Sequence, residues 1–349
     1  MTTEARRSVL VVIPTLNEVN TIEGVIEALC VDPPAEADIR FVVADGGSTD
    51  GTIERVRSLM AVRSELSLLH NPKRIQSAAV NQAVRTFGGG SQVLVRCDAH
   101  AIYPPGFVRR LLDTLDRTGS DAVVVPMDSV GRTCLERAVA WVSDTPLGSG
   151  GSAHRGGKRS GFIDHGHHAA FRMTSFSRAG GYDESFTHNE DAELDCRQRA
   201  LGSRVYLDAD IRLAYHPRGT FSGLSRQYFG YGRGRARTIR RHRGSMRLRQ
   251  FAVPTHCLSC LLAFGLAPWW PLALVWPGLY GLALGAASAL GAVRERSICG
   301  LLAGPAAAVM HGAWAAGFIW SLVSVRETRW QSALATPLWS SGTPPQVFR

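Results

Sequence analysis

The sequence predicts an α/β protein in which a doubly wound sheet is followed by C-terminal helices that enter a membrane. Two observations predict the sheet: β-branched runs alternate with segments of helical apolar spacing, and polar residues follow several of those runs. A third observation predicts the membrane helices, because residues 254–293 carry no formal charge. With 349 residues, of which 45% are hydrophobic, the chain can bury a full core, which excludes a disordered protein.

The expected strands are continuous apolar runs, which are typical of a parallel sheet covered on both faces. We expect strands at residues 8–13, 39–44, 66–69 and 92–96. Apolar residues at helical spacing predict helices at 21–30, 52–60 and 75–86. In a doubly wound sheet of this kind, ligands bind at the carboxyl ends of the strands.

Polar side chains follow the expected strands, at the edge where a ligand would bind. They are Thr15, Asn17 and Glu18 after the first strand, Asp45, Ser48, Thr49 and Asp50 after the second, and Asp98 and His100 after the fourth. The stretch DGGSTDGT also suits a turn and a helix cap, but polar ends on several strands favour a nucleotide site. The missing G-x-G-x-x-G after the first strand disfavours a dinucleotide dehydrogenase, and no P-loop motif occurs.

A cluster of acids opens a further helix, expected at 189–201. Glu190, Asp191, Glu193 and Asp195 lie at its start, and Arg197 and Arg199 lie at its end, the order that a helix dipole favours. Such acids alone would more often cap and solvate a helix than take part in catalysis. Together with the polar strand ends, they become candidate catalytic residues.

Basic residues are concentrated directly before the uncharged run. Nine arginines and no acid occur between positions 226 and 249: Arg226, Arg233, Arg235, Arg237, Arg240, Arg241, Arg243, Arg247 and Arg249. By the positive-inside rule, this segment lies on the cytoplasmic side, next to anionic lipid. Because the arginines adjoin membrane segments and carry no recognition motif, a nucleic-acid partner is excluded.

The uncharged run of about 40 residues corresponds to about 60 Å of helix, enough for a hairpin of two spans. Prolines and tryptophans in its middle suit a turn near a membrane interface. A second run, 297–325, could form one more span, but this would put Arg326 and Arg329 on the far side. We therefore expect two to three transmembrane or interfacial helices, with one run able to lie in the interface.

The N-terminus and the cysteines bear on the compartment. The first residues lack the apolar core of a signal peptide, so we expect a cytoplasmic catalytic domain on the inner (plasma) membrane. Seven dispersed cysteines, an odd number, predict reduced thiols rather than a disulfide framework. The expected organisation is a catalytic domain at 1–225, a basic segment at 226–250, membrane helices at 251–325 and a tail at 326–349.

Four motifs, in this order and spacing, resemble the family two inverting glycosyltransferases with a GT-A fold: VVIPTLNE, VADGGSTDGT, VRCDAHAIYPPGF and GGYDESFTHNEDAELDCR. The resemblance covers about residues 8–245. Within the family, TPLGSGGSAHR, DHGHHAAFR and QYFGYGRGRA are similar to the succinoglycan-type glucosyltransferases, which act on a polyprenyl-linked glycan.

The resemblance implies roles for individual residues. Asp191 would be the catalytic base, with Glu190 beside it. Nucleotide-sugar binding would fall to Pro14, Thr15, Asn17, Glu18, Asp45, Arg74, Asp98 and His168. The family's D-x-D motif appears here as D-A-H, so Asp98 and His100 would bind a divalent metal, magnesium or manganese. Gln76 stands where the family usually has a small residue.

Alternatives remain for two groups of side chains. Arg233 and Arg235 could bind the donor diphosphate through bidentate contacts, or they could only attract anionic lipid. His165, His167 and His168 have compact spacing for zinc, although no cysteine lies nearby and a donor-binding or packing role is favoured.

The expected function is a membrane-attached, inverting hexosyltransferase of exopolysaccharide biosynthesis. Its expected partners are a UDP-sugar donor, with UDP-glucose favoured by resemblance, a polyprenyl-diphosphate-linked glycan acceptor and membrane lipids. The competing hypothesis is a non-catalytic, membrane-anchored nucleotide-sugar binding protein, in which D-A-H marks lost metal binding. The Glu190-Asp191 pair favours the enzyme, because a binding protein needs no base.

Overall fold

The computed structural model describes residues 6–34, 36–150, 159–332 and 336–338. The chain divides into two compact units. The first contains the described residues of 1–127, 157–214 and 331–349, and the second contains those of 128–156 and 215–330. Two of the four unit boundaries fall within short strands, β7 (Met127–Ser129) and β11 (Leu213–Tyr215).

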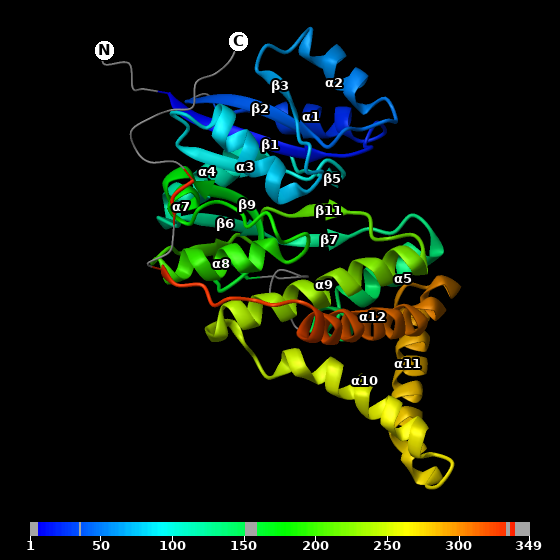
Figure 1. Cartoon of the computed structure of the whole chain (residues 1–349). Coiled ribbons are helices and arrows are strands. Elements are labelled where there is room, and N and C mark those ends of the chain that lie inside the picture. Colours follow the sequence, from blue (N-terminus) through cyan, green and yellow to red (C-terminus); the bar gives the residue numbers. More distant parts are fainter. Residues whose placement is uncertain (1–5, 35, 151–158, 333–335, 339–349) are drawn as a thin grey trace. The chain divides into compact units, whose positions relative to one another are not determined.

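The first unit is built around an eight-stranded sheet in the order β3-β2-β1-β4-β9-β6-β10-β8 (Figure 1). Its strands are β1 (Arg7–Thr15), β2 (Ala37–Asp45), β3 (Leu66–His70), β4 (Val93–Arg96), β6 (Ala122–Val125), β8 (Gly161–Phe162), β9 (His167–Arg172) and β10 (Val205–Leu207). The helices are α1 (Ile22–Cys30), α2 (Thr52–Met60), α3 (Gln76–Phe87), α4 (Phe107–Thr118), α7 (Met173–Arg178) and α8 (Glu190–Ala200). The short strand β5 (Ala101–Ile102) pairs outside this sheet, with β11.

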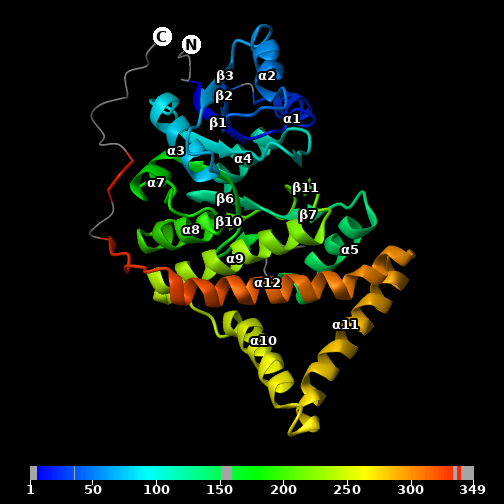
Figure 2. The same ribbon diagram turned by 45° about the vertical axis from the view of Figure 1, so that its right-hand side comes forward.

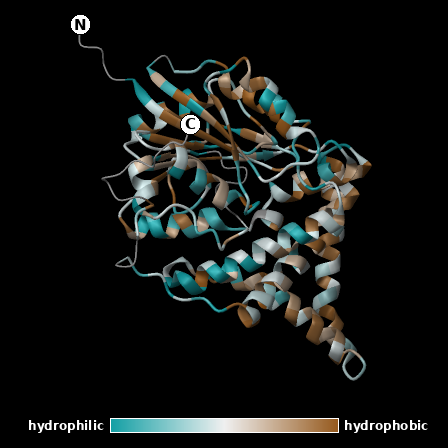
Figure 3. Cartoon of the chain, turned by 45° about the horizontal axis from the view of Figure 1, so that its top comes forward, coloured by the Kyte–Doolittle hydropathy of each residue, from teal (hydrophilic) through white to brown (hydrophobic). Residues whose placement is uncertain are grey.

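Because the sheet is covered on both faces, the middle of β1 is a continuous apolar run from Val9 to Ile13. In β1, Val9, Val11 and Ile13 face a core that includes residues of α1 and α4. Leu10 and Val12 face the opposite core, with residues of α3, α7 and α8. Hydrophobic colour accordingly dominates these strands in Figure 3. The predicted α/β class and doubly wound sheet are therefore confirmed.

Strand register brings the predicted polar ends together. Strands β1, β2 and β3 are parallel, with Thr15 opposite Asp45 and Asp45 opposite His70. Strand β4 is parallel to β1, and β9 runs antiparallel to β4. The loops after β1, β2 and β4 thus leave the sheet at one edge, as the alternating pattern predicts.

The second unit is helical. Its elements are α5 (Cys134–Ser143), α6 (Pro146–Ser149), α9 (Phe221–Arg241), η1 (Arg243–Ser245), α10 (Arg249–Leu266), η2 (Pro271–Leu274), α11 (Val275–Arg294), η3 (Ile298–Leu302) and α12 (Ala303–Ser324). Figure 2 shows α10 and α11 as the two arms of a hairpin, and α12 running alongside α9. By length and composition, 271–294 and 298–324 could cross a membrane, with mean hydropathies of 1.5 and 1.4.

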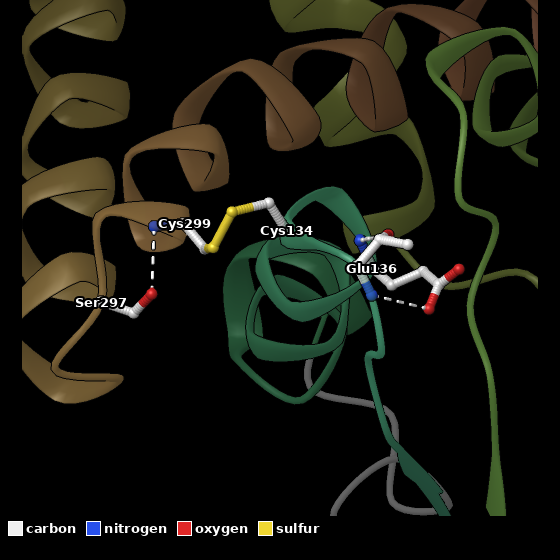
Figure 4. The surroundings of a disulfide bond; sticks show 5 residues. Cys134, Glu136, Ser297 and Cys299 are labelled. Carbon is white, nitrogen blue, oxygen red and sulfur yellow. Dashed lines mark hydrogen bonds between the residues drawn. A yellow bond between two sulfur atoms is a disulfide. The ribbon is translucent and has the colours of Figure 1, made fainter.

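A disulfide joins Cys134, at the start of α5, to Cys299 in η3 (Figure 4). The prediction that the cysteines are all reduced is therefore wrong for this pair. The sequence separation of 165 residues hides the pairing, which arises because η3 packs against α5. The other described cysteines form no disulfide: Cys30, Cys97, Cys196, Cys257 and Cys260.

Helices α9 and α12 approach so closely that their backbones touch. A Cβ atom on Gly232 of α9 would lie 2.0 Å from the carbonyl oxygen of Trp314. A Cβ atom on Gly317 of α12 would lie 2.0 Å from the carbonyl oxygen of Phe229. No side chain fits at either position, so the two glycines determine how these helices pack.

This packing predicts that Gly317→Ala destabilises the second unit by about 1–3 kcal/mol, because the added methyl group would force the helices apart. The measurement is thermal unfolding of the detergent-solubilised protein by near-ultraviolet circular dichroism. Gly312→Ala is the matched control on the same helix, since no atom lies within 4 Å of its added Cβ. Equal unfolding temperatures for the two variants would contradict the close approach.

Candidate active site

The loops that follow β1 and β2 are hydrogen-bonded to each other. The side-chain oxygen of Asn17 accepts a hydrogen bond from the backbone amide of Thr49 (2.9 Å). The backbone amide of Asn17 donates to the Ser48 hydroxyl (2.8 Å). The Asp45 carboxylate accepts hydrogen bonds from the amides of Gly47 and Ser48 and from the Ser48 hydroxyl. Asp45 thus orders the turn at the end of β2, while the pair of loops forms one fixed surface at the strand ends.

Three residues other than glycine adopt left-handed backbone conformations in loops of this edge. They are Asn17 (φ 57°), Arg74 (φ 57°) and Asn189 (φ 68°). A Cβ atom on Gly46 would lie 3.4 Å from the Arg74 Cα, so the loops after β2 and β3 are also in contact. Left-handed backbone is unfavourable for such residues and concentrates at functional sites, which supports the location of a site here.

Arg96, the last residue of β4, is the centre of a cluster of acids. Its guanidinium, with only 4% of the side chain exposed, donates to Asp191 Oδ1 (Nη1, 2.6 Å) and Asp98 Oδ1 (Nη2, 3.3 Å). Glu190 Oε1 lies 4.0 Å from Nη2. Arg96 therefore connects Asp98, the predicted metal-binding acid, to Asp191, the predicted catalytic base, and to its neighbour Glu190 on α8.

Two more side chains hold these acids in place. The Tyr182 hydroxyl donates to Asp191 Oδ1 (2.8 Å), and Gln76 Nε2 donates to Asp98 Oδ1 (2.8 Å). Asn81 hydrogen-bonds both the amide and the carbonyl of Tyr182, which fixes the Tyr182 backbone against α3. Gln76, which stands where the motif resemblance implies a small residue, thus orients Asp98.

His167, at the start of β9, lies between the same two aspartates. Its Nε2 is 3.3 Å from Asp98 Oδ2, and its Nδ1 is 3.8 Å from Asp191 Oδ2. Further contacts follow along the same face of α8, because residues 191, 195 and 199 are four apart and each contacts a residue of the 164–167 segment. His165 Nδ1 is 2.8 Å from the buried Asp195, and Arg199 is 3.2 Å from Asp164. The DHGHH stretch is therefore fixed against α8.

The charges of the cluster shift its titration. Burial would lower the pKa of Arg96, but Asp191 and other neighbouring acids raise it well above its ordinary value. Burial would raise the pKa of Asp98, but Arg96 and His167 hold it well below its usual range. Burial, with the charge of Asp191 beside it, raises the pKa of Glu190 to about 7. The site thus holds one firmly ionised carboxylate and one that titrates near neutrality.

The residues around Asp98 fit a divalent cation bound together with a diphosphate. His100 Nδ1 lies 2.9 Å from Glu18 Oε1. A hydrogen bond from Nδ1 to a carboxylate is the usual second contact of a metal-binding histidine, because it directs the Nε2 lone pair at the metal. Among the described residues, no three His, Cys, Asp or Glu side chains form a metal cluster. Phosphate oxygens of a donor would therefore have to complete the coordination of a metal at Asp98 and His100.

The structure brings many, but not all, of the predicted site residues together. Thr15, Asn17, Glu18, Asp45, Arg74, Asp98 and His100 lie on strand-end loops, and Glu190 and Asp191 begin α8. Pro14 occupies the β1 position opposite Ala44. The His168 side chain is outside the described residues. Arg233 and Arg235 belong to the second unit, so their contact with a donor stays a prediction.

Sequence reasoning missed Arg96, Tyr182 and the role of His167. A charged residue ending the otherwise apolar strand VLVR was a signal for Arg96, because a buried arginine requires acidic partners. The zinc alternative for the histidines is not supported, since no group of three His, Cys, Asp or Glu side chains in the described part of the chain could hold a metal ion. Tyr182 lies within the motif GGYDESFTHNEDAELDCR, but nothing in the motif indicates that its hydroxyl contacts Asp191.

Comparison with known proteins identifies the class of this site. Residues 10–180 match the family model described as glycosyl transferase family 2. A relative described in the next paragraph is 45% identical to this chain over most of both sequences. The chain therefore belongs to this family. The family and the GT-A fold predicted from the motifs are therefore confirmed.

The succinoglycan biosynthesis protein ExoA of Rhizobium meliloti (strain 1021) is 45% identical over 328 residues, covering 91% of this chain and 96% of ExoA. A Methanococcus voltae enzyme is 21% identical over 239 residues, covering 66% and 74%. Its name is dolichyl N-acetyl-alpha-D-glucosaminyl phosphate 3-beta-D-2,3-diacetamido-2,3-dideoxy-beta-D-glucuronosyltransferase.

Two solved structures share the fold. The mannosyltransferase PcManGT of Pyrobaculum calidifontis, in complex with GDP-Man and Mn2+, has a TM-score of 0.55 and 21% identity, covering 91% of this chain and 88% of its own. GalNAc-T7 with UDP, GalNAc and Mn2+ has a TM-score of 0.51 and 14% identity, covering 72% and 51%. Both neighbours were therefore solved with a nucleotide or nucleotide sugar and manganese.

The raised pKa of Glu190 predicts a pH-dependent stability. Below about pH 4.5 this side chain is protonated in both the folded and unfolded states, whereas above pH 7 folding must bury its charge beside Asp191. Stability is therefore lost as the pH rises through this window. Glu190→Gln should be more stable than the wild type by about 1–3 kcal/mol at pH 8 and equal to it near pH 4.5, measured by urea unfolding.

Glu184→Gln is the control with the opposite sign. Burial would raise the pKa of Glu184, but hydrogen bonds from Lys73 and Asn81 lower it. Its ionised form stabilises the fold, so this variant should lose stability at pH 8. A loss of stability at pH 8 in Glu190→Gln as well would show that the Glu190 carboxylate is not destabilised by burial.

Proposed function

We propose that this protein is a membrane-attached inverting glycosyltransferase that transfers a hexose from a nucleotide-sugar donor to a lipid-linked glycan in exopolysaccharide biosynthesis. Similarity to ExoA over nearly its whole length supports the pathway, and the succinoglycan-type motifs favour UDP-glucose as the donor. The observation that carries the catalytic part is the buried contact of Arg96 with both Asp98 and Asp191. A donor-binding acid and a base held by one cation suit a reaction at a single centre.

The transfer is a single displacement. The acceptor hydroxyl oxygen forms a bond to the anomeric carbon, and the bond from that carbon to the diphosphate oxygen breaks. Asp191 takes the proton from the hydroxyl, and UDP departs with the bonding electron pair. We assign the role of base to Asp191, as the family motif implies, with Arg96 and Tyr182 fixing it through Oδ1. Without a second carboxylate acting as nucleophile, the configuration inverts.

Asp98 and His100 would hold a divalent metal, and Glu18 would orient His100. When bound, the metal neutralises charge on the departing diphosphate. The Mn2+ in PcManGT and GalNAc-T7 supports manganese over magnesium, as does an imidazole in the ligand set. Asp45, Thr15, Asn17 and Arg74 are proposed donor contacts at the same edge.

Membrane attachment is proposed from the second unit. Its two long apolar segments, 271–294 and 298–324, follow the arginine-rich segment along the chain, and that segment matches an anionic cytoplasmic leaflet. Attachment at the inner membrane would bring the catalytic unit to a polyprenyl-diphosphate-linked acceptor in that leaflet. Arg233 and Arg235 are proposed either for the donor diphosphate or for lipid.

The second candidate function is a non-catalytic nucleotide-sugar binding protein. The buried Asp191 with its dedicated hydrogen bonds favours the enzyme, because binding a sugar nucleotide needs no such base. Incubation of the purified protein with UDP-glucose and a membrane fraction, followed by mass analysis of the lipid-linked product, separates the two. No product and no donor hydrolysis, with UDP still bound, would support the binding protein; a screen of other donors tests the choice of UDP-glucose.

The base assignment predicts that Asp191→Asn lowers the transfer rate at least about a hundredfold while UDP affinity changes little, since the amide cannot accept the proton. Turnover with saturating donor and calorimetric UDP binding measure the two quantities. Glu190→Gln is the matched neighbour and should reduce the rate less. If Glu190→Gln lowered the transfer rate more than Asp191→Asn, Glu190 would be the base.

The metal assignment predicts that Glu18→Gln weakens Mn2+ binding by about tenfold to a hundredfold, because the amide orients His100 less strongly. Electron paramagnetic resonance of Mn2+ titrated into the protein in the presence of UDP gives the affinity without an activity measurement. The control is Glu23→Gln, on the exposed face of α1, which should leave the affinity unchanged. Equal affinities in all three proteins would remove Glu18 from the metal site.

A further inference from the structure

Two apolar segments of the second unit pass the length requirement for a membrane span, but they differ in how they are packed. In segment 271–294, none of the most apolar 18-residue stretch is buried. In segment 298–324, 39% of the corresponding stretch is buried. The second segment contains α12, so the neighbours of α12 decide where it can lie.

The main neighbour of α12 is α9, a helix that cannot enter the hydrocarbon core. It carries six arginines and no acid: Arg226, Arg233, Arg235, Arg237, Arg240 and Arg241. Each arginine in the centre of a bilayer is strongly unfavourable. The glycine contacts described above press the backbone of α12 directly against α9, at Gly232 and at Gly317. Helix α12 therefore lies at the same membrane depth as α9.

Polar contacts hold the C-terminal end of α12 to the same helix. Arg240 donates to the carbonyl oxygens of Ser321 (2.8 Å) and Val325 (2.6 Å). Glu327, just beyond α12, forms ion pairs with Arg237 and Arg241 and is only 5% exposed. The end of α12 is thus fixed beside the end of α9, where a chain that had crossed the membrane could not be.

The N-terminal half of α12 is held by α5. Ala303, Ala306 and Met310 pack with Val139 and Val142 of α5 in one buried cluster. The disulfide between Cys134 and Cys299 joins α5 to the segment directly before α12 (Figure 4). Helices α5, α9 and α12 therefore form one layer, in which α5 packs against the N-terminal half of α12.

Parts of α12 also pack against α10 and α11, for example where Tyr280 of α11 is hydrogen-bonded to His311 (2.9 Å), and the rest of its surface is apolar and exposed. Gly312, Ala316, Trp320 and Val323 form an exposed stripe at helical spacing. A helix with one face packed on protein and the other apolar, with a tryptophan on that face, suits a position along a membrane interface.

The α10–α11 hairpin has the opposite character. Large apolar side chains of α10 and α11 are exposed, among them Leu261, Leu262, Phe264, Leu279, Leu282 and Val293. No charged residue occurs between Arg249 and Arg294, so charges flank the hairpin at its two ends. Such an exposed apolar surface needs a partner, and a bilayer with anionic headgroups at the arginines matches it.

We infer that the α10–α11 hairpin alone enters the bilayer and that α12 lies along the membrane surface on the side of α9. The inference rests on the proposed membrane attachment and specifies it. A hairpin that enters and returns keeps Arg326 and Arg329 on the same side as the arginines of α9. The positive-inside rule is then satisfied, which a three-span arrangement would violate.

Reporter fusions to the end of the full-length chain test the topology. Green fluorescent protein at the C-terminus should be fluorescent in intact bacterial cells, and alkaline phosphatase at the same position should be inactive, because both would be cytoplasmic. An active phosphatase with a dark fluorescent protein would mean an odd number of crossings and would overturn the inference.

Matched lysine substitutions test which helix is in the hydrocarbon. Leu282 of α11, which is 72% exposed, and Ala316 of α12 both point away from the protein. Leu282→Lys should lower the ratio of membrane-bound to soluble protein about a hundredfold, the effect of a lysine at the centre of a membrane helix. Ala316→Lys should change it less than about threefold, since its ammonium group reaches the headgroups.

Equal losses of binding in the two variants would overturn the assignment of α12 to the surface. Unchanged circular dichroism of both detergent-purified variants excludes misfolding as the cause of a difference. The wild-type protein separates this inference from the proposed function: if it is soluble, both fail, whereas membrane-bound wild type with an external C-terminus refutes the inference alone.

Discussion

The catalytic unit depends on one buried cation. Arg96 has almost no exposure to solvent, and its charge is tolerated because Asp191 and Asp98 accept its hydrogen bonds, with Glu190 4.0 Å away. The reverse also holds, since three carboxylates in so small a space would repel one another without the guanidinium. Because Asp98 follows β4 and the other two begin α8, the interaction links the sheet edge to the helix that covers it. Tyr182, His167 and Gln76 then refine positions that Arg96 has already restricted.

Local sequence patterns predict most of the first unit. Residues 52–60 form a helix with the expected bounds, and the other expected helices and strands between residues 8 and 96 agree within two residues at each end. The reason is that β1 to β4 alternate regularly with helices and are apolar on both faces, so periodicity alone identifies them. The strand-end residues follow from the same regularity, because parallel register brings Thr15 beside Asp45. The acids of α8 are found by the helix-dipole pattern.

Contacts between distant segments are not predictable in this way. Nothing local to Arg96 specifies an acid 95 residues later, and nothing near Cys134 points to Cys299. The ladder between α8 and residues 164–167 combines a helical spacing of four with the irregular spacing of a loop, so neither segment shows it alone. For α12, hydropathy predicts a membrane span, because it depends on the composition of the segment and not on the helices that pack against it. The two glycines, which permit the backbones of α9 and α12 to approach, and the contacts of Arg240 with the end of α12 distinguish a helix that packs on protein from one that faces lipid.

The layer formed by α5, α9 and α12 also sets an order of assembly during synthesis. Its three helices leave the ribosome far apart in time, since α5 ends at Ser143, α9 at Arg241 and α12 at Ser324. Between the last two, 83 residues are made, which takes about 4–17 seconds at ordinary bacterial rates. The α10–α11 hairpin emerges within that interval, while the glycine-lined face of α9 is still uncovered. Helix α12 can therefore pack against α9 only after the hairpin has been synthesised.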